Sequence, residues 1–281
     1  MSAATMSADT ELDVRLAGLD SIGLEELTER ASLLTRIDRK YVLPRSELDA
    51  VLGDLDPGVR VLDIDGVRSS SYESVYFDTP ELTSFLMTAH PRRRRFKIRT
   101  RTYVDSAQSY LEVKTRGGRG VTVKERLPYA VDDRSTLTLE GRRYTDSVLD
   151  EAAISAAEGQ ELVPTLMTRY LRTTLFVPES SSRATIDTGL SWSALYPSAR
   201  YPSARCDGTA TGPEDRQQRL DRPNLAIVET KSGSRASAVD RILWAHGHRP
   251  ATISKYGTGM AALCSELPGN KWAPVLRRYF R

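Results

Sequence analysis

Cations alternate with other residues from position 93 to position 101, where the sequence RRRFKIRTR carries Lys or Arg at every odd position. Alternate side chains of a β-strand share a face, so this stretch predicts a strand with one cationic and one partly apolar face. Residues 110–114 and 121–126 repeat the alternation. Like charges about 5 Å apart repel by roughly 3 kcal/mol at an effective dielectric constant of about 20. Neighbouring strands that turn Lys and Arg to one side therefore indicate a polyanionic ligand.

The placement of charge, and not its excess, must produce this field, because 40 Lys and Arg nearly balance 37 Asp and Glu and leave a formal net charge of +3. Nucleic-acid-binding proteins usually carry a larger excess, so no specific nucleic-acid partner is expected. Cys206 and Cys264 form no CxxC motif, and the histidines lack zinc spacing, which indicates a reduced, zinc-free, cytoplasmic protein. No apolar run or leader pattern predicts a membrane span or export, which leaves room for a separate membrane partner.

The chain of 281 residues is long enough for one large domain. Residues 1–20 are rich in small and polar residues without apolar periodicity and are predicted to be disordered. Residues 21–281 are predicted to form a single domain. Within it, residues 198–223 are polar and contain several Gly and Pro, which predicts a long mobile loop.

Hydrophobic periodicity predicts a mainly β fold of the α+β class with flanking helices. Helices are expected at 24–34, 46–55, 79–89, 145–157, 234–246 and from about 258. Strands are expected at 36–43, 71–77, 93–103, 109–115, 119–127, 165–177, 183–192 and 225–231. About eight strands in mainly antiparallel order can close into a barrel, so we expect an eight-stranded antiparallel β-barrel tunnel.

The cationic strands supply the first candidate binding residues. Arg99 and Arg101 lie well inside their strand, beside Lys114 and Lys124 of the strands that follow, and we expect them to contact the ligand. For residues 92–94 a solvated basic edge and a ligand contact both remain open.

Later strands carry isolated charges that allow two interpretations each. Arg172 and Arg183 can be ion-pair partners within the fold or further ligand contacts. Glu229 and Lys231 share one face of an otherwise apolar strand, where they can form a surface pair. Alternatively, a carboxylate among cations is a ligand for Mg²⁺ or Mn²⁺, which prefer oxygen.

Seven short motifs occur in a characteristic order along the chain: DRKYVL at 38–43, VYFDT at 75–79, KIRTR at 97–101, LEVK at 111–114, VKER at 123–126, LAIVETK at 225–231 and SKY at 254–256. In this order they resemble the VTC domain, the polyphosphate polymerase domain of the vacuolar transporter chaperone complex. That domain is a member of the triphosphate tunnel metalloenzyme superfamily, and the resemblance covers roughly residues 30–265.

The resemblance implies a tunnel in which basic side chains hold a triphosphate and an acidic residue, Glu229, holds a divalent metal, Mn²⁺ or Mg²⁺. The implied catalytic residues are Arg99, Arg101, Lys114 and Glu229. The substrate-binding residues are Lys40, Arg99, Arg101, Lys114, Lys124, Arg126, Arg172, Arg183 and Lys255. The superfamily signature E-x-E-x-K reads Arg36-x-Asp38-x-Lys40 here, which weakens a triphosphatase assignment more than a polymerase one.

The resulting hypothesis is a phosphotransferase, a metal-dependent polyphosphate polymerase that moves the γ-phosphate of ATP to a growing chain. Phosphoryl transfer needs no protein nucleophile, since cations and metal can stabilise the transition state. ATP or another triphosphate and polyphosphate are therefore the expected partners. Two alternatives remain open: a tripolyphosphatase or nucleoside triphosphatase with the same fold, and a non-catalytic module that binds polyphosphate or nucleic acid.

Overall fold

The computed structural model describes residues 8–31, 37–117, 122–195 and 218–280. The chain divides into two compact units, each assembled from three stretches of sequence. Unit 1 comprises Met1–Ser70, Tyr170–Leu190 and Arg222–Thr252, and unit 2 comprises Ser71–Arg169, Ser191–Asp221 and Ile253–Arg281. The sequence predicts a single domain. The structure divides the chain into two units that alternate along the sequence, so neither unit is a continuous stretch of chain.

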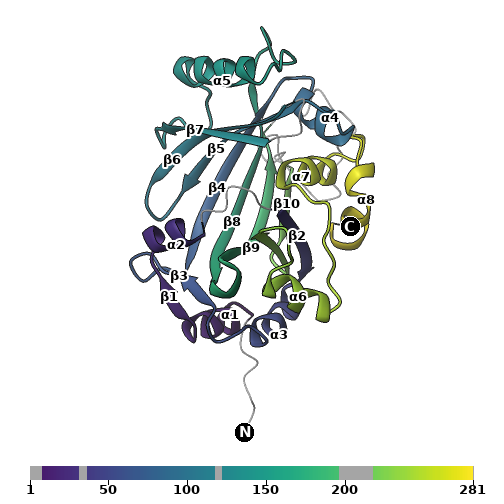
Figure 1. Cartoon of the computed structure of the whole chain (residues 1–281). Coiled ribbons are helices and arrows are strands. Elements are labelled where there is room, and N and C mark those ends of the chain that lie inside the picture. The colour runs from purple at the N-terminus through teal and green to yellow at the C-terminus, as the bar shows by residue number, and fades with distance from the viewer. Residues whose placement is uncertain (1–7, 32–36, 118–121, 196–217, 281) are drawn as a thin grey trace, which may run out of the picture. The chain divides into compact units, whose positions relative to one another are not determined.

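Eight strands follow one another along a hydrogen-bonded path in the order β2-β11-β9-β8-β4-β5-β6-β7 (Figure 1). Their bounds are β2 Ile37–Pro44, β4 Ser69–Asp78, β5 Arg95–Tyr103, β6 Gln108–Arg116, β7 Thr122–Tyr129, β8 Val163–Val177, β9 Ser182–Ala194 and β11 Leu225–Ser232. The short strands β1 (Asp20–Ile22) and β3 (Arg60–Leu62) pair in parallel, whereas β11 with β2 and β9, and β5 with β4 and β6, are antiparallel. The mainly antiparallel β fold with flanking helices is therefore confirmed.

The path of strands is open within the described residues, in contrast to the closed barrel expected from the sequence. It ends at β2 in one direction and at β7 in the other. The carbonyl of Lys40 in β2 accepts a hydrogen bond of 2.7 Å from the amide of Ala251. A connecting segment thus occupies part of the strand edge that a closing strand would need.

In unit 1, α1 (Ala8–Ala17), α3 (Leu48–Gly53) and α6 (Ala238–Ala245) pack on one face of β2, β11 and β9. Residues 8–17 were expected to be disordered and instead form a helix. Leu12 and Leu16 stand one helical turn apart, and both are buried in this core. The helix α2 (Leu24–Arg30) packs separately, with Leu27 in a small cluster that includes Phe176.

In unit 2, α5 (Leu139–Glu151) covers the apolar face of β5 and β6 (Figure 1). Phe96, Ile98, Leu111 and Val113 are buried against it, as the strand alternation predicts. The helix begins six residues earlier than the expected start at 145. Its start is set by Thr138, whose side chain accepts a hydrogen bond from the amide of Gly141.

The segment expected to be a long loop is partly a strand. Residues 219–222 form β10 (Arg219–Arg222), which pairs with β9. The rest of the predicted loop up to residue 217 lies outside the described residues, as do residues 1–7 of the predicted N-terminal disorder.

Three helices of unit 2, α4 (Thr83–Ala89), α7 (Lys255–Leu263) and α8 (Ala273–Tyr279), lie close together (Figure 1). The rings of Phe85 and Trp272 pack with centroids 5.7 Å apart, and Phe85 also meets Tyr256 edge-on. A Cβ atom at Gly257 would lie 2.2 Å from Cζ2 of Trp272. The glycine is therefore needed for this close approach of α7 to the indole ring.

We predict that Gly257→Ala lowers the free energy of unfolding by about 1–3 kcal/mol, because the added methyl group overpacks the contact with Trp272. At a helical site without this contact, alanine would instead gain about 1 kcal/mol over glycine. Gly233→Ala, in a bend outside the helices, is the control for the added methyl group alone, since no atom lies within 4 Å of a Cβ built there. Equal urea midpoints for the two variants would contradict the prediction.

Candidate functional site

The cationic face predicted from strand alternation is present in unit 2. In β5 the odd positions are half-buried and the even positions are buried. The register places Lys97 opposite Lys114, and Lys114 opposite Lys124. It also places Arg101 opposite Tyr110. Side chains of β5, β6 and β7 therefore share one face, and this face carries the Lys and Arg residues that the sequence predicted to lie together.

A buried carboxylate, Glu112 of β6, stands in the middle of these cations with 3% of its side chain exposed. Its Oε2 lies 2.6 Å from Nη2 and 2.8 Å from Nε of Arg99, and its Oε1 lies 2.6 Å from Nζ of Lys124. Burial alone would raise the pKa of Glu112, but Arg99, Arg101 and Lys124 outweigh it and hold that pKa well below its usual range. Burial also lowers the pKa of Lys124, which Glu112 partly offsets.

Glu112 was not among the residues selected from the sequence. The signal was present, because Glu112 has the same strand parity as Lys114, and the register then sets it opposite both Arg99 and Arg126. A search for cations alone passes over this carboxylate, which is the acidic residue on this face of β5, β6 and β7 within the described part of the chain.

Tyrosines line the same face. Arg99 donates a hydrogen bond of 3.2 Å to the hydroxyl of Tyr76, and Arg126, which is exposed, lies 4.9 Å from the ring centroid of Tyr110. Arg101 lies 5.6 Å from the ring of Tyr72, and its Nε is buried with no hydrogen-bond partner among the described residues. A buried donor without an acceptor costs about 1–3 kcal/mol, so this atom suits an oxyanion ligand.

The ninth predicted binding residue, Lys255, lies outside these strands. It is the first residue of α7, whose N-cap residue Ser254 receives a hydrogen bond of 3.0 Å from Nζ of Lys97. The carbonyl of Lys255 accepts from Nε1 of Trp192 at 2.9 Å. Lys97 of the cationic face therefore contacts the residue next to Lys255.

Unit 1 presents a second charged face, formed by β2, β11 and β9. Glu229 pairs with Lys40 on one side and with Thr185 on the other, as expected for residues that share a face. Lys231 pairs likewise with Asp38 and Arg183. These pairings bring the predicted metal ligand Glu229 next to the predicted phosphate ligand Lys40.

Arg172 of β8 forms a fork-shaped ion pair with Asp187 of β9. Its Nε lies 2.6 Å from Oδ1, and its Nη2 lies 2.8 Å from Oδ2. Burial would lower the pKa of Arg172, but Asp187 outweighs it and raises that pKa well above its usual value. The structure thus shows the ion-pair role that the sequence left open, and a phosphate contact of Arg172 stays a prediction.

Lys231 lies among charges of both signs. The pKa of Lys231 is lowered to about 8, mainly by burial and also by the charges of Arg183 and Arg172, while Glu229 and Asp38 oppose the fall. Its ammonium group therefore loses its proton far more readily than an exposed lysine does.

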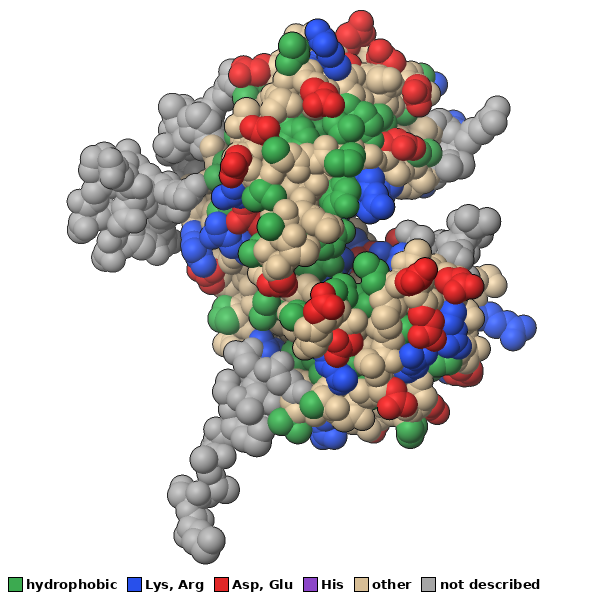
Figure 2. All heavy atoms as spheres, turned by 90° about the vertical axis from the view of Figure 1, so that its left-hand side faces the viewer, with side chains coloured by type: hydrophobic (Ala, Val, Ile, Leu, Met, Phe, Trp, Pro, Cys, Tyr) green, Lys and Arg blue, Asp and Glu red, His purple; other side chains and the backbone are tan. Residues whose placement is uncertain are grey.

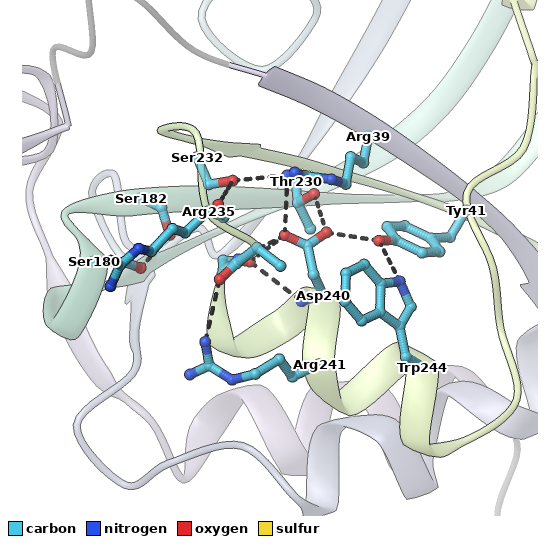
Figure 3. A network of polar contacts seen from close by, with 12 residues as sticks. Arg39, Tyr41, Ser180, Ser182, Thr230, Ser232, Arg235, Asp240, Arg241 and Trp244 are labelled. Atoms are coloured by element: carbon cyan, nitrogen blue, oxygen red, sulfur yellow. Dashed lines mark hydrogen bonds and ion pairs between the residues drawn. The ribbon is translucent and has the colours of Figure 1, made fainter.

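A network of buried polar groups joins β2 and β11 to α6 on the side of these strands opposite to Lys40 and Glu229 (Figure 3). Asp240 of α6 accepts hydrogen bonds from the hydroxyls of Tyr41 at 2.7 Å and Thr230 at 2.6 Å. Trp244 donates to the same Tyr41 hydroxyl at 3.0 Å. Tyr41 follows Lys40 and Thr230 follows Glu229, so the network fixes the strand positions that bear those two charges.

The residues around Glu229 fit a metal ion only in one way. Among the described residues, no group of three or more His, Cys, Asp or Glu side chains could hold a metal. Mg²⁺ is commonly bound by one or two carboxylates together with substrate phosphates and waters. Glu229 therefore fits a metal that binds together with a polyphosphate, and not a site built from protein ligands alone.

Figure 2 shows acidic and basic side chains interspersed over the visible face of the molecule. None of the helices that the structure describes is long and apolar enough to cross a membrane.

The profile of the VTC domain matches residues 35–264 of this chain. The chain belongs to the VTC domain family. Similar solved structures include a putative adenylyl cyclase from Hippeastrum with a dominant triphosphatase activity, at 14% identity and TM-score 0.45, covering 81% of this chain and 96% of that one. A putative adenylate cyclase from Bacillus halodurans is similar at 12% identity and TM-score 0.46, over 78% and 94% of the two chains. No curated protein sequence matches.

We predict that Glu112→Gln destabilises the ligand-free protein by about 1–3 kcal/mol, less than for a fully buried pair because Lys124 is partly exposed. The amide leaves the cations uncompensated, so tripolyphosphate should raise the melting temperature more in the variant than in the wild type. Glu125→Gln, one residue from Lys124 and exposed, is the control. A smaller ligand-induced shift in Glu112→Gln would contradict this role.

We predict that affinity for tripolyphosphate falls as pH rises through about 8, because the anion favours the charged form of Lys231. Between that value and the ordinary 10.5, unfolded chains bind more protons at this lysine than folded ones, so its contribution to ligand-free stability rises with pH. Calorimetric titrations at several pH values measure the fall. The Lys231→Arg variant stays positively charged throughout this pH range, so its affinity should change only as the ligand itself titrates. Identical profiles of affinity against pH for both proteins would exclude Lys231 as the cause of the fall.

Proposed function

We propose that this VTC domain protein is a metal-dependent polyphosphate polymerase, which transfers the γ-phosphate of ATP to the end of a polyphosphate chain. The observation that carries the proposal is the buried Nε of Arg101, without an acceptor among the described residues, on a face where Glu112 balances only part of the cationic charge. Membership of the VTC domain family supports an enzyme of the triphosphate tunnel type.

The cations would bind and orient the phosphates. Arginine offers a planar fork of donors for two phosphate oxygens, and lysine acts as a point charge. We assign phosphate binding to Arg99, Arg101, Lys114, Lys124, Arg126 and Lys255 in unit 2 and to Lys40, Arg172 and Arg183 in unit 1. Most of these side chains stand on strands, whose registers fix their spacing.

Glu229 would hold Mn²⁺ or Mg²⁺ as one carboxylate ligand. When bound, such an ion would neutralise negative charge on the phosphate oxygens. Lys40, which pairs with Glu229 across the strands, and Lys231, two residues further along β11 on the same face, place positive charge beside this carboxylate.

For phosphoryl transfer the protein needs only to position the reactants and to stabilise negative charge. A terminal oxygen of the chain forms a bond to the γ-phosphorus, while the bond from that phosphorus to the β–γ bridging oxygen breaks and ADP leaves. Arg99, Arg101 and Lys114 are the catalytic residues of the proposal, because their fixed cations stabilise the oxygens on which charge is redistributed. We place this reaction in the cytoplasm, without a specific nucleic-acid partner.

The test is incubation of the purified protein with ATP and Mn²⁺, followed by electrophoretic separation of long polyphosphate from free phosphate. Long chains with release of ADP support the polymerase. Free phosphate without chains would assign a triphosphatase instead. Binding of tripolyphosphate without turnover would leave a binding module.

We predict that Arg101→Ala lowers turnover by about tenfold or more, since a charge-assisted contact is worth about 1.5–3 kcal/mol. Arg143→Ala on α5 is the matched control, because Arg143 is exposed and has no ion pair among the described residues.

Glu229→Gln should abolish metal-dependent turnover and keep tripolyphosphate binding without metal. A loss of only a few-fold at saturating Mn²⁺ would place the metal elsewhere.

A further inference from the structure

Three cations gather at the far end of the unit 2 face. Arg95 begins β5 and stands directly opposite Arg116, the last residue of β6. Lys271, from the turn before α8, belongs to the same cluster, since burial lowers its pKa and the charges of Arg95 and Arg116 lower it further. All three side chains are half-buried.

This end of the face lacks the compensation found at its centre. No ion pair within the described residues involves Arg95, Arg116 or Lys271. Their contacts are to neutral groups: Arg95 donates to the carbonyl of Arg92 at 2.9 Å, and Lys271 donates to the carbonyl of Thr88 at 2.8 Å. Like charges directly opposite each other across a strand pair are destabilising.

The position of Lys271 is fixed by packing. The next residue, Trp272, is almost fully buried between Phe85 and Gly257. Burial of that indole ring anchors the backbone that carries the lysine, so its ammonium group stays near the two arginines. Fixed cations that do not compensate one another favour an anionic ligand.

We propose that Arg95, Arg116 and Lys271 form a second anion subsite, which binds the continuing chain of inorganic polyphosphate beyond the triphosphate. Along β5 it lies six residues from Arg101, about 20 Å at the rise of an extended strand. Three linked phosphates do not reach that far. Lys97, Lys114 and Lys124 pair with one another across β5, β6 and β7 next to the subsite, and Arg99 and Arg126 flank Glu112 at the following position on that face, so cations continue along the whole distance.

This inference rests on the proposed function and predicts a dependence on chain length. The subsite adds contacts for a long chain and none for tripolyphosphate. The test measures dissociation constants by calorimetry for two proteins, the wild type and the double variant Arg116→Gln, Lys271→Gln. The two ligands are tripolyphosphate and polyphosphate of about 15 phosphates, a length that exceeds the strand distance given above.

In the double variant we expect the long chain to bind about tenfold or more weakly and tripolyphosphate within about twofold of wild type. The control is Arg277→Gln with Arg278→Gln, which removes the same charge from exposed positions of α8. Circular dichroism verifies that both double variants are folded. If the Arg116→Gln, Lys271→Gln variant is unfolded, the double variant Arg95→Lys with Arg116→Lys replaces it. This variant keeps the positive charges but loses the paired N–H donors of the two guanidinium groups.

Each outcome bears on one of the two proposals. Wild-type protein that binds neither ligand would refute the proposed function. Wild-type protein that binds both with equal affinity, or a double variant that weakens both equally, would refute the subsite alone. A 15-nucleotide single-stranded DNA that depends on the pair as strongly as polyphosphate does would overturn the assignment in favour of nucleic acid.

Discussion

Repulsion between cations that share a sheet face is the constraint on which the described site depends. Strand alternation forces the basic side chains of β5, β6 and β7 to one side, where each raises the free energy of its neighbours. Glu112 relieves this repulsion at the centre of the face by binding Arg99 and Lys124. The compensation is partial, because one carboxylate stands among several cations, and the remaining charge is what a polyanion can neutralise.

Each charged face is supported by buried polar groups. Behind the face of unit 1, Asp240 ties β2 and β11 to α6 through Tyr41 and Thr230. In unit 2 the hydroxyl of Tyr256 donates to Asp78 at 2.6 Å, and its ring stacks on Tyr76 with centroids 5.0 Å apart. Burial raises the pKa of Asp78 to about 6, although the hydrogen bonds that it accepts oppose the rise. These contacts hold fixed the strands that carry the charges, so that neighbouring cations cannot move apart.

Much of the fold could be predicted because the strands obey a period of two and the helices carry clear caps or apolar stripes. The sequence did not predict α1, since two leucines one turn apart are a weak signal until a core is available to bury them. It also did not show that the strand path stays open, because the contact between Lys40 and Ala251 joins residues far apart in the chain.

The sequence by itself determined which side chains share a face, because alternation in an extended strand is a local property of the backbone. It therefore selected Arg99, Arg101, Lys114 and Lys124 as neighbours, and likewise Glu229 with Lys231. Only the tertiary structure decided which of these charges are compensated, since register and burial depend on strands and helices distant in sequence. The pairs of Glu112 with Lys124 and of Arg172 with Asp187 exist because separate strands meet, and Lys271 joins Arg95 because Trp272 is buried elsewhere in the same unit.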